Sequence, residues 1–358
     1  MKMRILHFID SLGVGGAETL LKDTISHYKR IFPEDEHFVA TLHRVAGFEE
    51  LIRREASYYS LDFSFIRLFD VGLTYRKILK EAKIDIVHSH LNESTIIARL
   101  FTPSSIPLVS TYHSGYLHPK AWNYSFKRKF VEKILYKKSH YCLCVSDSVA
   151  DIVAPALNLK RGNYEVLKNF YDDRFLPTYQ YKNDKRLRLV TVGNLTRQKN
   201  QVLLLNALKE LDNSDISLDI YGEGNSRTEL QSIIDDNQLN VQLKGRAFIT
   251  SELLEEYDLF VMSSLDEGFG IALVEAMATG LPSVLPDLPA LKEVAKESAL
   301  YFKRSSVKEA SDLLRYVIKH KEILKKLSER AVEISKDYSV NSKIRQLNQV
   351  YMKLTAKK

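Results

Sequence analysis

The sequence contains only two cysteines and no long apolar segment. Cys142 and Cys144 stand two residues apart on one expected strand, so a disulfide framework is excluded and a reducing compartment fits. No apolar run approaches the ~18 residues that a membrane-spanning helix requires. The opening residues 1–10 turn polar too soon for a signal peptide. We therefore expect a cytoplasmic protein, with any membrane contact peripheral, at the inner face of the plasma membrane.

The length and composition fit two ordinary globular domains. The chain has 358 residues, of which 45% are hydrophobic and 27% charged. Apolar, strand-like segments alternate with segments of helical period, which predicts α/β domains with parallel sheets covered on both faces. We expect a first domain at 1–176, a polar linker at 177–187, a second domain at 188–339 and a final helix at 340–358.

Two histidines, His88 and His90, share one face of an expected strand. Such a pair suits a metal ion, but no third ligand stands nearby in the sequence. Satisfied polar side chains at a strand end are the alternative, and we expect no metal.

A glycine-rich loop, GVGGAE at 13–18, joins the first expected strand to the first expected helix. Loops of this kind bind phosphate, and the dinucleotide-binding fingerprint has its third glycine at the last of these positions. This chain has Glu18 there, which weakens an oxidoreductase interpretation.

The stretch most informative about function combines a strand, a loop with two glycines and a short helix. The expected strand is at 259–262, the loop and helix follow as EGFGIALVEAMATGLPSV from Glu267, and Gly280 suits a left-handed helix cap. The N-terminus of this helix offers free N–H groups to a phosphate. Glu267 and Glu275, eight positions apart, would flank that ligand and accept hydrogen bonds from a sugar and a ribose.

This Glu-x7-Glu string resembles the nucleotide-sugar site of retaining glycosyltransferases of family 4. The resemblance implies the GT-B fold, in which two Rossmann-like domains face a cleft and the last helix crosses back to the first domain. It also implies transfer of a sugar from a nucleoside diphosphate sugar, with UDP favoured and no obligatory cofactor. The implied acceptor is a glycan or a lipid-linked glycan in bacterial surface polysaccharide synthesis.

The resemblance assigns roles to residues of this sequence. Glu275 holds the ribose, Glu267 the donor sugar and Lys199 the diphosphate, while His113 serves the acceptor. Asn194 stands where the family usually has arginine, and our hypothesis is that Arg197 replaces it. Catalytic roles thus fall to Glu267, His113, Lys199 and Arg197, and donor-binding roles to Gly15, Gly16, Asn194, Arg197, Lys199, Gly222, Arg246, Ala247, Phe248, Glu267, Gly268, Phe269, Gly270, Ile271 and Glu275.

The segment 120–138 is strongly basic, with seven Lys or Arg residues against Glu132 and five interleaved aromatics. Two interpretations remain open. A basic, aromatic helix can lie on an anionic membrane. Alternatively, the helix is solvated and its aromatics face the core. We expect no nucleic-acid partner.

Two further functions remain open beside the transferase. A nucleotide-sugar epimerase shares the expected fold and needs no acceptor. A non-catalytic nucleotide-sugar-binding subunit would also fit, because a lost arginine at Asn194 is typical of a degenerate partner.

Overall fold

The computed structural model describes residues 2–13, 15–45, 47–64, 67–119, 124–182, 186–212 and 214–356. The chain divides into two compact units, here the first domain (Met1–Asn169 with Val340–Lys358) and the second domain (Phe170–Ser339). The division after Asn169 lies ahead of the linker expected at 177–187. Among the described residues, no helix is both long enough and apolar enough to cross a bilayer.

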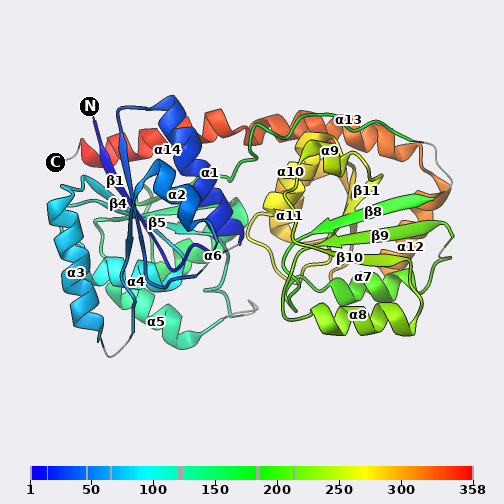
Figure 1. Cartoon of the computed structure of the whole chain (residues 1–358), viewed down its shortest axis with the longest axis horizontal. Helices are drawn as coiled ribbons and strands as arrows, with labels where there is room; N and C mark the ends of the chain where they lie inside the picture. Colours follow the sequence, from blue (N-terminus) through cyan, green and yellow to red (C-terminus); the bar gives the residue numbers. More distant parts are fainter. Residues whose placement is uncertain are drawn as a thin grey trace. The chain divides into compact units, whose positions relative to one another are not determined.

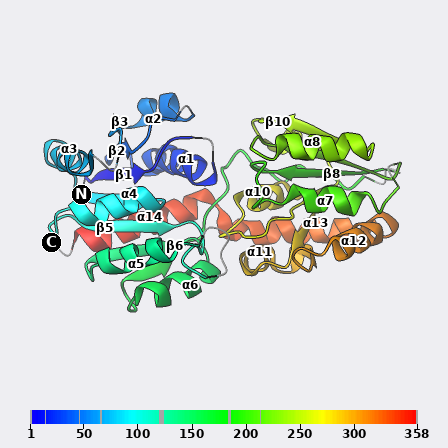
Figure 2. The same ribbon diagram turned by 90° about the horizontal axis from the view of Figure 1, so that it is seen from below.

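The first domain is a parallel sheet with helices on both faces (Figure 1, Figure 2). Its seven strands lie in the order β3-β2-β1-β4-β5-β6-β7. The elements are β1 (Arg4–Ile9), α1 (Gly16–Ile31), β2 (Glu36–Thr41), α2 (Glu49–Glu55), β3 (Ser57–Ser60), α3 (Leu68–Glu81), β4 (Ile86–His90), α4 (Asn92–Phe101), β5 (Leu108–Tyr112), α5 (Phe126–Leu135), β6 (His140–Cys144), α6 (Asp147–Leu157), β7 (Tyr164–Val166) and α14 (Val340–Thr355).

Alternation along β1 separates a mainly apolar face of this sheet from one on which His7 lies between the apolar Ile5 and Ile9. Leu6 and Phe8 point to one face, where they pack against Tyr75 of α3 and Ile97 of α4. His7 points to the other face, which α1 and α14 cover. The sheet is thus buried on both sides, as parallel sheets require.

The C-terminal helix α14 packs on the first domain. Tyr28 of α1 donates a hydrogen bond to Asn348 Oδ1 at 2.7 Å. Tyr351, fully buried, lies with its hydroxyl 2.5 Å from His88 Nδ1. The expected return of the last helix to the first domain is confirmed.

The second domain repeats this architecture with six parallel strands in the order β10-β9-β8-β11-β12-β13. Its elements are β8 (Leu187–Val192), α7 (Gln201–Leu208), β9 (Ile216–Tyr221), α8 (Arg227–Asp236), β10 (Val241–Gly245), α9 (Ser251–Leu254), β11 (Leu259–Val261), α10 (Ile271–Thr279), β12 (Ser283–Pro286), α11 (Pro289–Ala295), β13 (Ala299–Phe302), α12 (Val307–Lys319) and α13 (Ile323–Ser335), with two short 3-10 turns at Lys296–Ser298 and Lys336–Tyr338.

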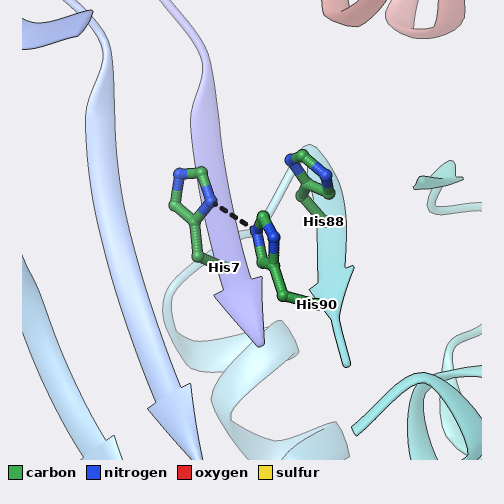
Figure 3. Close-up of side chains that lie close together, drawn as sticks. All are labelled: His7, His88 and His90. Carbon is green, nitrogen blue, oxygen red and sulfur yellow. Dashed lines mark hydrogen bonds between the residues drawn. The ribbon is translucent and has the colours of Figure 1, made fainter. Parts of the chain in front are cut away.

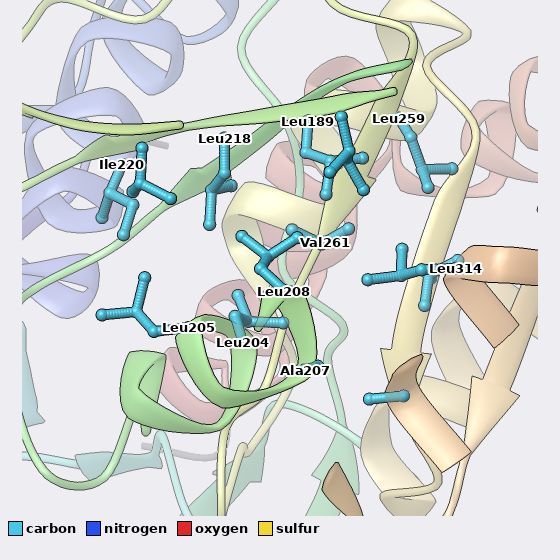
Figure 4. Packing of buried hydrophobic residues seen from close by; sticks show 14 of the residues in the cluster. Leu189, Leu204, Leu205, Ala207, Leu208, Leu218, Ile220, Leu259, Val261 and Leu314 are labelled. Carbon is cyan, nitrogen blue, oxygen red and sulfur yellow. The ribbon is translucent and has the colours of Figure 1, made fainter. Parts of the chain in front are cut away.

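The main core of the second domain lies between its sheet and α7, α8 and α12 (Figure 4). Leu189, Leu218 and Val261 point from the strands toward Leu204 and Leu208 of α7. Because α7 is apolar around most of its circumference, it is buried rather than amphipathic.

Local signals in the sequence placed several element boundaries correctly. The left-handed cap is confirmed, because Gly280 follows α10 with φ +85°. Ser146 caps α6 and accepts a hydrogen bond from the Val149 N–H, also as expected. The short strands β3 and β7, and the helix α3, carried weaker signals.

A fully buried ion pair attaches α5 to the rest of the first domain. Arg99 of α4 and Glu132 of α5 are both completely buried at their side chains, with Arg99 Nη1 3.1 Å from Glu132 Oε2. Tyr112 of β5 donates to the same carboxylate oxygen at 2.6 Å, and Tyr116 donates to Oε1. Since charges are costly to bury, the network depends on the pairing of Arg99 with Glu132.

We expect Glu132→Ala to destabilise the first domain by about 3–5 kcal/mol, because it leaves the Arg99 guanidinium buried without a carboxylate. Hydrogen exchange of the β5 amides would measure the loss. The double replacement Arg99→Leu with Glu132→Leu removes both charges and should lose less than the single variant. A loss below about 1 kcal/mol in Glu132→Ala would contradict the argument.

Candidate functional site

In each sheet, the first strands are added outward on one side of the first strand and the later strands outward on its other side. The two series meet at one switch point, between two neighbouring strands. In the first domain this point lies between β1 and β4, and in the second between β8 and β11. Open parallel sheets bind ligands beyond the carboxyl ends of the strands at this point. The loops after β8 and β11 contain seven of the fifteen residues that the sequence predicts for the donor, and the helix that follows β11 contains two more.

These two loops of the second domain are joined by side-chain and backbone bonds. Lys199 Nζ lies 2.6 Å from Glu267 Oε1, and Ser264 donates to the same oxygen at 2.7 Å. The Leu265 N–H donates to the Gln198 carbonyl at 2.8 Å. Lys199 and Glu267, 68 residues apart, are therefore held together as one charged pair.

The helix α10 begins directly after this pair. Gly270 precedes it with φ +90° and ψ 67°, and no side chain caps the helix. The first N–H groups of α10 therefore lack helical acceptors and carry the positive end of the dipole. Phe269 packs its ring against Tyr338 in the core and is 2% exposed, so its side chain is not available to a ligand.

A residue that the sequence analysis missed, Arg174, connects two expected donor residues. Its guanidinium lies 4.9 Å from the ring centre of Phe248, which is 71% exposed. Its Nη2 lies 4.0 Å from Glu275 Oε1. Phe248 and Glu275, both expected to bind the donor, are thus neighbours of one arginine.

The remaining expected donor residues fall into two groups. Gly222 leaves no room for a side chain, because a Cβ there would lie 2.0 Å from the Gly193 carbonyl oxygen. Backbone packing within the second domain therefore explains why position 222 is a glycine. Asn194, Arg197, Arg246 and Ala247 are exposed.

In the first domain, the glycine-rich loop begins α1. Gly15 precedes the helix, and Gly16 is its first residue. A Cβ on Gly15 would lie 2.5 Å from Glu18 Oε2, so Gly15 leaves room for the Glu18 carboxylate. Burial, and then the neighbouring Asp10, raise the pKa of Glu18. A carboxylate at this helix end opposes a dinucleotide phosphate, in agreement with the sequence argument against an oxidoreductase.

His113 follows β5 and lines a polar cavity of about 210 Å³ at the carboxyl edge of the first sheet. Its Nε2 is buried and has no hydrogen-bond partner within the described part of the chain. Burial lowers the pKa of His113 to about 4, so the ring is neutral at physiological pH.

Behind His113, four more histidines form a buried row on the face covered by α1 and α14. His7 Nε2 lies 3.1 Å from His37 Nδ1, and His7 Nδ1 lies 3.4 Å from His90 Nε2. Figure 3 shows His7 and His90 facing each other, with His88 alongside. Burial, reinforced by neighbouring imidazoles, lowers the pKa of His7, His88 and His90.

His7 is the third imidazole that the sequence analysis did not find near His88 and His90. Strand pairing places it directly opposite His88, and ligand atoms of the three rings lie within 4.8 Å of one another. Both nitrogens of His88 already have partners, Tyr351 Oη and Thr111 Oγ1 at 2.6 Å. Because a metal would displace these bonds and those of His7, the arrangement fits a hydrogen-bonded row better than a metal centre.

The basic segment lies partly on α5, while Lys120 and Trp122 fall outside the described residues. Phe126, Phe130 and Ile134 follow one another at four-residue spacing and are 69%, 56% and 63% exposed. Glu132 and Arg128 lie on the opposite side. Phe126 and Phe130 therefore do not face the core. For these two residues, the interpretation in which the aromatics of the helix pack into the core is excluded.

Comparison with known proteins identifies the family. Residues 14–175 match the model for Glycosyltransferase Family 4, and residues 175–334 match the model for Glycosyl transferases group 1. The chain belongs to glycosyltransferase family 4. As a family 4 glycosyltransferase it has the GT-B fold, as the sequence predicted.

Several curated relatives of this family 4 chain are glycosyltransferases. A segment is 34% identical over 114 residues to the UDP-N-acetylglucosamine--peptide N-acetylglucosaminyltransferase GtfA subunit of Streptococcus agalactiae, covering 31% of this chain and 22% of that subunit. The uncharacterized glycosyltransferase MJ1178 of Methanocaldococcus jannaschii is 23% identical over 90% of this chain and 88% of its own length. The UDP-Gal:alpha-D-GlcNAc-diphosphoundecaprenol alpha-1,3-galactosyltransferase of Escherichia coli is 26% identical over 63% of this chain and 64% of its own.

Among solved structures, Anabaena Alr3699/HepE in complex with UDP-glucose matches with a TM-score of 0.83. The sequence identity is 18%, over 97% of this chain and 99% of that chain. At this identity the likeness establishes the fold.

The histidine row makes the stability of the first domain depend on pH. A free imidazole titrates near pH 6.5, whereas burial lowers the pKa of His37 to about 3. Between these values the unfolded chain binds a proton that the folded domain does not. The unfolding free energy is therefore full above about pH 6.5 and falls as the pH is lowered, by up to ~1.4 kcal/mol per pH unit for each such histidine.

We expect His37→Asn to lower the number of protons taken up on unfolding between pH 6 and 4 by about one. The slope of the unfolding free energy against pH should fall accordingly. Hydrogen exchange of the β1 and β4 amides at several pH values would measure it. An unchanged slope in the variant would show that His37 is protonated in the folded domain.

Proposed function

We propose that this chain is a retaining hexosyltransferase that uses a nucleoside diphosphate sugar, with UDP favoured. The acceptor is a glycan or a lipid-linked glycan in bacterial surface polysaccharide synthesis. The observation that carries the proposal is the Lys199–Glu267 pair beside the uncapped N-terminus of α10.

Two positive groups converge beside Glu267 in the second domain. The Lys199 ammonium and the free N–H groups of α10 both favour an anion, which suits the diphosphate of the donor. Glu267 uses Oε1 for Lys199 and Ser264, which leaves Oε2 for a hydroxyl of the donor sugar. Glu275 then takes the ribose hydroxyls, and Phe248 with Arg174 stacks on the base.

The chemistry needs no nucleophilic side chain. The bond between the anomeric carbon and the diphosphate oxygen breaks, and the acceptor oxygen bonds to the same face of that carbon. The acceptor proton passes to the released diphosphate. Lys199, the N–H groups of α10 and, in our hypothesis, Arg197 stabilise the charge that develops on the leaving group.

The relatives support this donor and acceptor class. The name of the Escherichia coli relative specifies a UDP-sugar and a diphosphoundecaprenol-linked acceptor, and Alr3699/HepE was solved with UDP-glucose.

We expect slow release of nucleoside diphosphate from one member of a panel of nucleotide sugars. Glu275→Ala should abolish it. Lys199→Ala should reduce turnover about 100- to 1,000-fold, because it removes charge stabilisation from the transition state. Its midpoint of thermal unfolding should change little, since Lys199 is partly exposed and such ion pairs contribute little.

Lys209→Ala, an exposed lysine at the end of α7, is the matched control and should behave as wild type. No release from any donor, with UDP or GDP still raising the thermal midpoint, would identify a non-catalytic binding subunit instead. That alternative rests on Asn194 at the family's arginine position. Wild-type turnover in folded Lys199→Ala would refute the role of Lys199.

We further propose that α5 lies on an anionic membrane. Its exposed stripe of Phe126, Phe130 and Ile134 is apolar, and exposed cations, Lys127 and Lys133 among them, lie alongside. Such a helix inserts its apolar face at the level of the headgroups, and its cations attract acidic lipids.

The protein should float with phosphatidylglycerol vesicles at about 0.15 M salt, but not with neutral phosphatidylcholine vesicles. Phe130→Ser should lower the bound fraction about tenfold, because it removes ~1.5–3 kcal/mol of apolar burial. Leu51→Ser, at an exposed leucine of α2, serves as the control. Failure of the wild type to float with anionic vesicles would refute the membrane proposal.

A further inference from the structure

The polar cavity beside His113 lies at the point where the first sheet reverses its strand order. It is lined by residues that follow three strands, by two residues at the end of β5 and by one residue of α5. Those that matter here are Asp10 after β1, Asn92 and Glu93 after β4, His113 and Tyr116 after β5, and Arg128 of α5.

The charges of this cavity are separated along the edge of the sheet. Asp10 and Glu93 lie toward β1 and β2, and Glu93 Oε2 is 2.8 Å from His43 Nε2, just after β2. Arg128 lies beyond β5, over the Tyr116 ring at 5.7 Å. Among the described residues, no carboxylate forms an ion pair with Arg128, although Glu132 stands one helical turn away and binds Arg99 instead.

Three side chains of the lining, Asn92, Tyr116 and Asp10, are held by hydrogen bonds. Asn92 donates to Glu132 Oε1 at 2.6 Å, and Tyr116 donates to the same oxygen. Asp10 accepts the Ser94 N–H at 2.7 Å. His113, whose buried Nε2 has no hydrogen-bond partner among the described residues, belongs to the same lining. A preformed cavity with one cation, two carboxylates and a neutral imidazole suits a ligand with an anionic end and a hydroxylated end.

We infer that this cavity binds the acceptor, and that the acceptor is a sugar linked directly to phosphate or diphosphate, with Arg128 on the phosphate. Asp10 and Glu93 accept hydrogen bonds from the sugar hydroxyls, and His113 contacts the hydroxyl to be glycosylated. The inference rests on the proposed function and specifies its acceptor.

The position of Arg128 on α5 agrees with a lipid carrier. Arg128 and the apolar stripe lie on opposite sides of one helix, so they are separated by about one helix diameter, ~10 Å. A diphosphate group that reaches the cavity would thus remain within the headgroup depth of a membrane on which α5 lies.

The test compares hexosyl diphosphate undecyl lipids with the matching undecyl hexosides, below their aggregation concentrations and without vesicles. Calorimetric titration of the full-length protein should show tighter binding of one diphosphate-linked member than of its hexoside. Arg128→Ala should weaken that member about 10- to 100-fold, as expected for loss of a charged hydrogen bond. It should leave the hexoside unchanged. Arg161→Ala, an exposed arginine of the same domain outside the cavity, is the matched control.

Equal binding of both lipid classes by the wild type, no binding of any diphosphate-linked member, or a preference that survives Arg128→Ala would overturn the inference. Donor cleavage sensitive to Glu275→Ala is measured on the same preparations. If cleavage is present and the preference absent, only the acceptor assignment fails. If no donor is cleaved, the proposed function fails independently of these titrations.

Discussion

Parallel pairing of every strand is the constraint on which both candidate sites depend. It brings the loops that follow the strands to one edge of each sheet, whatever their separation in the sequence. Lys199 and Glu267 meet because β8 and β11 are neighbours. Asp10, Glu93 and His113 meet because β1, β4 and β5 are neighbours. The same constraint buries both faces of each sheet, which explains why polar side chains within the strands need internal partners.

The buried polar groups show how far the first domain meets that requirement, since His37 Nε2, His90 Nδ1 and Arg99 Nε have no hydrogen-bond partner among the described residues. On one face of its sheet, imidazoles bond to one another and to hydroxyls of Thr111 and Tyr351. On the other, Arg99 and Glu132 neutralise each other below α5. Both networks end at the cavity, one at His113 and the other at Asn92 and Tyr116. The elements that stabilise the domain therefore also fix the groups that would face a ligand.

The sequence predicted the architecture well, because hydrophobic period and caps are local. The strand, loop and helix around Glu267 and the left-handed cap at Gly280 needed no distant information. Contacts that depend on topology were beyond its reach. Arg174 meets Phe248 74 residues away, and His7 joins His88 only through strand pairing. The period of α5 indicated a stripe of aromatics but not its direction, which is set by a buried glutamate that apolar-core rules would place outside.

The return of α14 to the first domain has a consequence for biosynthesis. All strands of the first domain have been translated once the ribosome passes Val166. The hydroxyl that bonds to His88 belongs to Tyr351, which is translated much later. The 170 residues of the second domain, Phe170–Ser339, are translated in between. At roughly 5–20 residues per second, this interval is about 10–30 s. During this interval the histidine face of the nascent first domain lacks α14, its last covering helix. The first domain is therefore begun first but completed after the second domain.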